Sequence, residues 1–240
     1  MYAKDMEVTR EQALENMKDI KAKMIDGFVW KKEYTALPSE VKEFIENRFF
    51  YAYTNYCFAK QKNEYLARLQ QVGLNPNYMN PGSGYLYLSD ALLADVAVSA
   101  WLLIDNDTKS NGLMGLKATI SKYTSTYPVL RVAKIEGAIL NSANIKWLNI
   151  IRNKIIAHSD VKIFQHLDDN SENDNVLMIE SCLDEIFEVL TNINEAYFDT
   201  SIHREHRLNI DESFISDLSD AIKKSVSKET RQRYPLGFHP

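Results

Sequence analysis

The chain has 240 residues, 45% of them hydrophobic, which is enough to build a substantial core in one large or two small domains. Its 8 glycines and 6 prolines are few, so the composition favours long helices over a sheet-rich fold with many tight turns. The formal net charge of -5 excludes a surface that is positive throughout, because non-specific binding of nucleic acid depends on neutralisation of phosphates by lysine and arginine.

Two helices are predicted before the first break in the chain. Thr9 and Gln12 have the spacing of a capping box, which opens a helix that runs to about Met24. Pro38 opens a second helix, of about 35 residues, whose apolar periodicity continues to Gly73. A helix of that length is expected to bend or to pair with a long antiparallel neighbour.

The second helix contains a cluster of aromatic residues, Phe49, Phe50, Tyr51, Tyr53 and Tyr56. Aromatic side chains on a surface would stack on nucleic-acid bases. Their helical spacing favours the other interpretation, which is packing in the core.

The stretch 73–84 is the clearest break, because glycine, proline and asparagine are concentrated there. It lacks the composition of a flexible charged linker, so we expect a loop within one structural unit. The next helix, over 85–104, is apolar on nearly every side and is expected at the centre of a bundle. A shorter helix is predicted over 113–124.

Helices are also predicted over 130–143, from residue 146 onwards and over 176–199, with a polar loop at 160–175. The last of these carries an apolar stripe that we expect to be buried and that includes Leu177. A final helix is predicted at about 211–226, before a basic and aromatic end. That end would either contact RNA or a partner or form a loosely ordered tail.

Cys57 and Cys182 are isolated from one another and form no CxxC pair, so we expect ordinary buried thiols. The first residues lack an apolar signal core, and the apolar stretch around 91–104 is too short to span a membrane. These features predict a cytoplasmic protein without a membrane segment.

The helix that begins near Lys146 places unusual residues among apolar ones. Arg152, Asn153, Ala157 and His158 form the pattern Arg-Asn-x-x-x-Ala-His. This pattern resembles the signature of HEPN domains, the helical family named for higher eukaryotes and prokaryotes nucleotide-binding. Many HEPN members are metal-independent ribonucleases of toxin–antitoxin and abortive-infection systems.

A second, looser similarity points in the same direction. The apolar helix that ends in Leu-Ile-Asp at 103–105, followed by Leu-Met-Gly-Leu at 113–116, looks like the abortive-infection AbiU branch of that family. The resemblance covers about residues 85–200. It implies an all-α, HEPN-like helical bundle at 85–204. The helical patterns outside the resemblance add a hairpin of long helices packed on this core at 1–72 and a C-terminal helix and basic tail at 205–240.

The resemblance also implies roles for individual residues. His158 would transfer protons, Arg152 would hold the phosphate, and Asn153 would orient the histidine or bind substrate. Lys146 and Lys154 would bind substrate, since basic residues outnumber acidic ones over 131–162. No metal and no cofactor is expected.

Asp95 is a supporting candidate, because a carboxylate in an apolar helix needs a partner. It would pair with Arg152, position His158 or form a buried salt bridge that has only a structural role. His203 and His206 lie three positions apart in a charged segment that also contains Glu205, and the spacing of the two histidines would suit a metal. No third ligand suggests itself, so a solvated surface is the favoured interpretation.

Positions six apart on an ideal helix differ by roughly 240° of rotation, so Arg152 and His158 cannot share one face of a straight helix. Either the helix ends near Ala157 and lets the histidine turn inward, or a two-fold dimer brings the two residues together. A dimer would also supply two histidines, one as acid and one as base. The HEPN nucleases that the motif resembles are dimers with a composite site.

The sequence therefore leads to three hypotheses. The first is a homodimeric HEPN endoribonuclease, a toxin or phage-defence effector that cleaves RNA. The second is a non-catalytic HEPN module that binds RNA, nucleotide or a partner protein. The third is a protein whose site is modified by a nucleotidyltransferase-type antitoxin. The chain has no P-loop, Rossmann, nucleophile-elbow or zincin motif, so those enzyme classes lack support.

Overall fold

The computed structural model describes residues 28–73, 83–105, 107–131, 142–157 and 172–204, together with Glu15 and Asp19. This part of the chain is helical, as predicted. Its elements are the 3-10 helix η1 (Lys32–Tyr34) and the α-helices α2 (Ser39–Gly73), α3 (Ser83–Ile104), α4 (Leu113–Thr124), α6 (Ala143–Ala157) and α8 (Glu172–Tyr197). Within these ranges the only β-type pairing is one antiparallel bridge, between Trp30 and Phe198.

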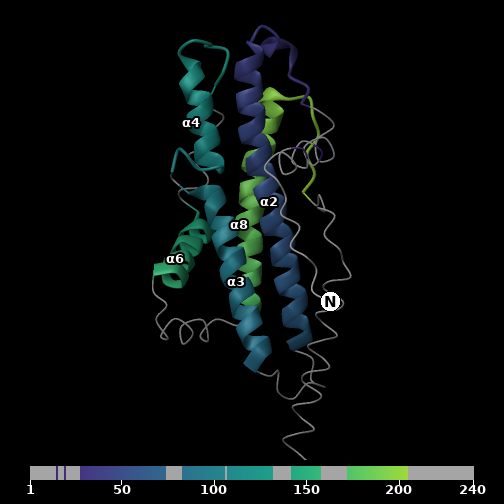
Figure 1. Ribbon diagram of the computed structural model, residues 1–240, viewed down its shortest axis with the longest axis vertical. Coiled ribbons are helices and arrows are strands. Elements are labelled where there is room, and N and C mark those ends of the chain that lie inside the picture. Colours follow the sequence, from purple (N-terminus) through teal and green to yellow (C-terminus); the bar gives the residue numbers. More distant parts are fainter. Residues whose placement is uncertain are drawn as a thin grey trace, which may run out of the picture.

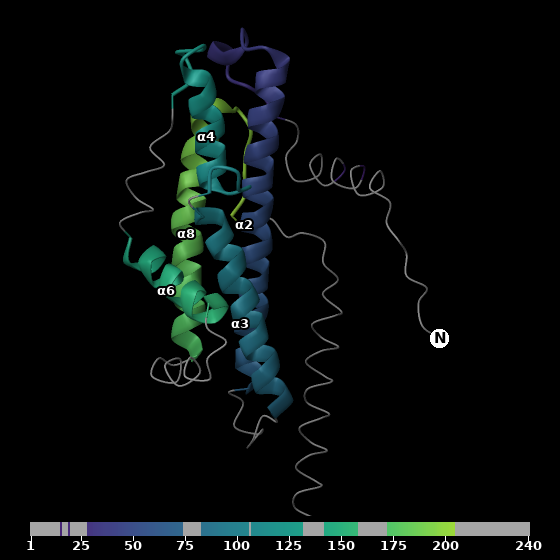
Figure 2. The ribbon, with the colours of Figure 1, turned by 60° about the vertical axis from the view of Figure 1, so that its left-hand side comes forward.

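The three longest helices, α2, α3 and α8, lie side by side along the long axis of the molecule (Figure 1). Helix α4 packs beside the first half of α2, whereas α6 lies obliquely against α3 and α8 (Figure 2). Helix α3 thus contacts α2, α4, α6 and α8, which confirms its predicted place at the centre of the bundle.

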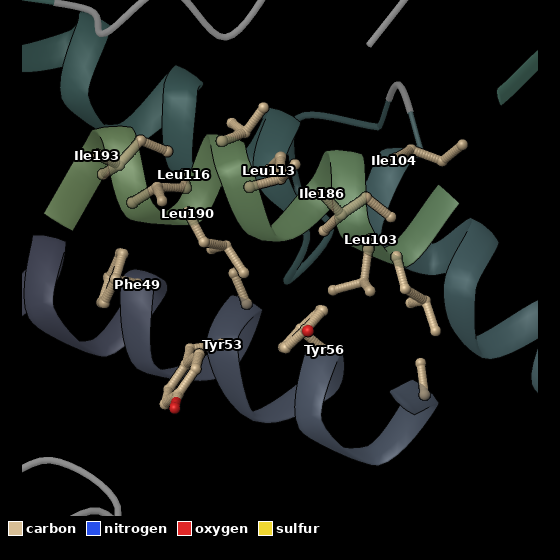
Figure 3. Close-up of a cluster of buried hydrophobic side chains, with 14 of the residues drawn as sticks. Phe49, Tyr53, Tyr56, Leu103, Ile104, Leu113, Leu116, Ile186, Leu190 and Ile193 are labelled. Carbon is tan, nitrogen blue, oxygen red and sulfur yellow. The ribbon is translucent and has the colours of Figure 1, made fainter. Parts of the chain in front are cut away.

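The core lies where α2, α3, α4 and α8 face one another (Figure 3). Helix α2 contributes apolar residues at intervals of three and four, so that one stripe of a long helix is buried along its length. The buried residues of this stripe include Val41, Ile45, Phe49, Tyr53, Tyr56 and Leu66. Among them, Phe49 and Tyr56 lie toward α8, whose buried residues include Ile186, Leu190 and Ile193 (Figure 3).

The aromatic cluster of α2 belongs to this core. Phe49, Tyr53 and Tyr56 are completely buried, Phe50 is 3% exposed, and Tyr51 is half-buried. Tyr53 stacks between Phe49 and Tyr56 at centroid distances of 6.5 and 6.4 Å. The core interpretation is confirmed, because side chains enclosed in this way are not available to stack on a base.

The bounds of α2 agree with the sequence, whereas α8 begins four residues earlier than expected. Asn175, which the sequence places in a polar loop, lies within α8 and is 2% exposed. Asn63 of α2 donates a hydrogen bond from Nδ2 to the carbonyl oxygen of Val176, 3.3 Å away. Packing against α2 therefore overrides the weak helix propensity of this polar segment.

The prediction that Leu177 belongs to the buried stripe of α8 is wrong. Its exposure is 63%, because the buried face of the helix passes through Ile179, Leu183 and Ile186. Leu177 lies on the opposite side, together with the exposed residue Ser181.

Several predictions fall on residues that the structure does not describe. These are most of the helix at 9–24, most of the helix at 130–143, most of the loop at 160–175, the helix at 211–226 and the tail. At the start of the range 130–143, Leu130 and Arg131 are described and are not helical. Helix α2 shares one core with α3, α4 and α8. None of the helices in the described ranges is long and apolar enough to cross a membrane.

Two glycines allow α3 and α4 to be joined tightly. A Cβ atom on Gly112 would lie 2.5 Å from the carbonyl oxygen of Leu102, and one on Gly115 would lie 1.9 Å from that of Ser110. Arg48 of α2 holds the same turn, since its Nη1 donates to the carbonyl oxygen of Ser110 at 3.0 Å. The turn that fixes the end of α3 therefore has no room for a side chain at these positions.

Gly115→Ala should lower the free energy of unfolding by about 2 kcal/mol or more, because the added methyl group must displace backbone. Urea or thermal unfolding followed by circular dichroism would measure the change. Ser121→Ala, at an exposed position of the same helix, is the control and should leave stability nearly unchanged. A Gly115→Ala protein as stable as the parent would show that the turn is looser than the structure has it.

Both cysteines are buried, as predicted, and they do not form a disulfide. Burial raises the pKa of each thiol, Cys57 and Cys182, to about 12. At pH 8 a pKa of that size leaves roughly one thiol in 10⁴ ionised. A chromogenic disulfide reagent should therefore react with both cysteines only as the protein unfolds, and rapid reaction of either thiol with the folded protein would contradict their burial.

Candidate functional site

The residues of the Arg-Asn-x-x-x-Ala-His pattern that the structure describes are carried by α6, whose start is anchored to α8. Ser142 caps the helix, since its Oγ accepts hydrogen bonds from the backbone N–H groups of Asn144, at 3.1 Å, and Ile145, at 3.4 Å. The Ser142 hydroxyl in turn donates to Oε1 of Glu185, at 2.9 Å, as does the Asn144 side-chain amide at the same distance. These bonds fix the register of α6 against the bundle.

One face of α6 is buried and the other is open. Ile145, Leu148 and Ile151, spaced by three, have exposures of 2, 0 and 7% and pack into the core. The exposed face contains Lys146, Asn149, Ile150 and Asn153. Arg152 is half-buried at the boundary between the two faces.

The guanidinium group of Arg152 is held from two directions. Its Cζ lies 3.9 Å from the centroid of the Trp101 ring of α3, which is a close cation–π stack. Its Nη1 donates a hydrogen bond to Oδ1 of Asn153, at 2.8 Å. The indole Nε1 of Trp101 donates to Oδ1 of Asn149, also at 2.8 Å.

Arg152 has no carboxylate partner among the residues that the structure describes. Its Nε is buried and lacks a hydrogen-bond partner within the same ranges. An arginine of this kind retains a full positive charge that the described part of the fold does not neutralise. With Nε facing protein and Nη1 bonded to Asn153, the end formed by Nη1 and Nη2 is the edge that remains for an anion.

Asp95 does not pair with Arg152. Its Oδ2 lies 2.8 Å from Nζ of Lys62 on α2, and Lys62 also donates to the hydroxyl of Ser99, at 2.9 Å. The Asp95 side chain is 53% exposed, so the pair is a salt bridge at the surface rather than a buried one. It ties α3 to α2 about two helical turns before Trp101.

Of the other candidate residues, Lys146 and Lys154 belong to α6. Lys146 lies on the exposed face of this helix, and because Asn153 is seven positions further on, the two residues project in nearly the same direction. His158 comes directly after Ala157, the last residue of α6, and lies outside the described residues.

Trp101 and Asn149 are parts of the site that sequence reasoning missed. The sequence places Trp101 only on the apolar surface of its helix and does not single out Asn149. The spacing of Asn149 and Arg152, three positions apart on one helix, makes them neighbours and is the signal that was available. Trp101 approaches from another helix, and no local sequence pattern predicts such a tertiary contact.

The structure describes one member of the His203, Glu205 and His206 cluster. The backbone N–H of His203 donates to the Tyr53 hydroxyl, at 3.0 Å, and its carbonyl oxygen accepts from the same hydroxyl, at 2.8 Å. Glu205 and His206 lie beyond the described residues. In the described part of the chain no three His, Cys, Asp or Glu side chains are placed so that they could share a metal ion.

The chain matches no protein-family model, no curated protein and no solved structure. A functional assignment therefore depends on the sequence pattern of α6 and on the contacts of Arg152.

Proposed function

We propose that the chain is a metal-independent endoribonuclease of the HEPN type that acts as a toxin or phage-defence effector. The observation that carries this proposal is the state of Arg152. Its guanidinium is held by Trp101 and Asn153 without a carboxylate partner in the described part of the chain, and it belongs to the same sequence pattern as His158. The all-helical bundle is the architectural context in which this pattern is expected.

The proposed reaction is transfer of a phosphodiester within RNA. A base removes the proton of a 2′-hydroxyl, and the 2′-oxygen attacks the adjacent phosphorus. The bond to the 5′-oxygen breaks as an acid protonates that oxygen, which leaves a 2′,3′-cyclic phosphate and a 5′-hydroxyl. His158 serves proton transfer, because a histidine titrates near neutral pH and general acid–base catalysis contributes about 10²–10⁴-fold.

Arg152 stabilises the negative charge of the phosphate. The negative charge on the non-bridging oxygens increases as the 2′-oxygen attacks, and a fixed cation next to them stabilises that transition state most. Arginine suits this role because its planar fork donates two parallel hydrogen bonds to one phosphate. The half-buried position of Arg152 strengthens the interaction, since water screens it less than it would a fully exposed side chain.

Binding of RNA is expected to be local, because the chain as a whole is acidic. Lys146 and Asn153 on the exposed face of α6 extend the surface next to Arg152, and Lys154 belongs to the same helix. These residues would contact the backbone on either side of the scissile phosphate. Asp95 would act only indirectly, by anchoring α3 to α2 through Lys62.

A second copy of the chain is the proposed partner in catalysis. Each chain offers a single histidine within the pattern, whereas the reaction needs both an acid and a base. A two-fold dimer supplies both and matches the composite site of the nucleases that the pattern resembles. An antitoxin of the nucleotidyltransferase type and a cytoplasmic location belong to the same proposal.

The proposal is tested by incubation of the purified protein with a pool of tRNA and mRNA in the presence of EDTA. The expected result is cleavage by the parent and by a Lys122→Ala control, and much slower cleavage by Arg152→Ala. Lys122 is exposed on α4, far along the chain from the pattern of α6, and its removal changes the net charge equally. Binding of RNA without cleavage would instead favour a non-catalytic module.

A further inference from the structure

We infer that Trp101 and Asn149 are positioning residues that orient Arg152 so that its Nη1–Nη2 end faces the phosphate of the substrate. This inference rests on the proposed function and specifies how the site achieves it. Neither residue belongs to the Arg-Asn-x-x-x-Ala-His pattern. Their roles are derived from a chain of contacts between α3 and α6.

The first link in that chain fixes the plane of the guanidinium. Trp101 approaches Arg152 from α3, and 3.9 Å between Cζ and the ring centroid leaves the two planar groups in direct contact. A stack of this kind restrains the tilt of the guanidinium relative to the ring. The indole is itself fixed, because its Nε1–H donates to Oδ1 of Asn149, one turn before Arg152 on α6.

The second link fixes rotation within that plane. Nη1 of Arg152 donates to Oδ1 of Asn153, and Nε is turned into protein. One hydrogen of Nη1 and both hydrogens of Nη2 have no partner among the described residues. The guanidinium therefore presents its end, rather than its Nε side, to an incoming group, and two parallel donors at that end match two oxygens of one phosphate.

The arrangement has an energetic consequence. A free arginine side chain loses rotamer entropy when it is immobilised, and part of that cost is met before substrate arrives if the side chain is already held. Within the described residues, Nε of Arg152 keeps this orientation without a hydrogen bond, although a buried N–H group normally makes one. If Arg152 only joined α6 to α3, an orientation in which its Nε–H group makes a hydrogen bond would be more stable.

The experiment is a double-mutant cycle on the affinity for a 2′-O-methyl RNA oligonucleotide, which cannot be cleaved because the nucleophile is blocked. Arg152→Ala should raise Kd about tenfold, the loss of a charge-assisted contact. Trp101→Leu and Asn149→Ala should each raise Kd by roughly three- to tenfold in the parent. Neither should raise it further in the Arg152→Ala background, since each acts through the arginine.

Two further variants separate positioning from stability. Trp101→Phe keeps an aromatic face under the guanidinium and should retain most of the affinity. Trp30→Leu is the matched control, because Trp30 is also half-buried and also donates from Nε1 to a side chain of a neighbouring helix, Glu46 at 2.7 Å. It should cost stability while leaving Kd unchanged. Asn149 is exposed, so Asn149→Ala gives a folded variant even if Trp101→Leu does not.

The outcomes separate this inference from the proposed function. If Trp101→Leu or Asn149→Ala weakens binding as much in the Arg152→Ala background as in the parent, the two residues are structural and the inference is overturned. The inference is also overturned if both variants bind like the parent while Arg152→Ala does not. If the parent binds no RNA, or Arg152→Ala binds as well as the parent, the proposed function fails and the inference fails with it.

Discussion

His158→Ala should lower the rate constant of RNA cleavage by about 10²–10⁴-fold, the contribution of one general acid–base group. The reason is that alanine can neither accept the proton of the 2′-hydroxyl nor return one to the departing 5′-oxygen. In a two-fold dimer the substitution removes both histidines of the composite site. The rate is measured with enzyme in excess over a labelled RNA, so that a single turnover reports the chemical step.

A second histidine provides the control for that substitution. His203 uses its backbone N–H and carbonyl groups to bind the Tyr53 hydroxyl, whereas its side chain is exposed. His203→Ala should therefore keep both the fold and the parental rate. Equal losses in the two variants, or a His158→Ala protein as active as the parent, would remove His158 from the mechanism.

Arg152→Ala should lower the same rate constant by about 10²–10³-fold, which is the usual effect of removing one group that stabilises developing negative charge. Arg152→Lys should recover little of it, because an ammonium group has no planar fork and does not stack on Trp101 as a guanidinium does. Thermal unfolding of both variants checks that the bundle persists.

Arg152→Ala should also change how the affinity for RNA depends on salt concentration. Loss of one phosphate contact should reduce the slope of log affinity against log salt by about one unit, to be compared with the Lys122→Ala control. An Arg152→Lys protein with parental activity would show that any cation suffices and that the held geometry is irrelevant. If Lys122→Ala reduced the slope as much as Arg152→Ala does, the effect would be due to the overall charge of the protein and not to the site.

Local sequence signals were sufficient to predict much of the bundle. Pro38 and Gly73 delimit α2 because proline favours a helix start and glycine its end, and the apolar spacing between them specifies the buried stripe. The predicted start of α8 is too late because Asn175 is a poor helix former in isolation. Its burial against α2, with Asn63 bonded to the neighbouring carbonyl, depends on residues more than a hundred positions away.

In the candidate site, too, some features could be predicted from the sequence and others could not. The proximity of Arg152 and Asn153 results from their adjacency. How His158 comes near Arg152 stays a prediction, because His158 lies outside the described residues. The partners of Trp101 and Asp95 could not be predicted, because both are set by how α3 packs on α6 and α2. Apolar helices present many faces, and only tertiary packing selects which side chains meet.

The chemical nature of the new ends of cleaved RNA tests the central claim most directly. Fragments made by the parent in EDTA would be analysed by mass spectrometry. A 2′,3′-cyclic phosphate on one fragment and a 5′-hydroxyl on the other is the result expected when the RNA's own 2′-oxygen is the nucleophile. A 3′-hydroxyl together with a 5′-phosphate would contradict it, because such ends require attack by water and a different set of catalytic groups.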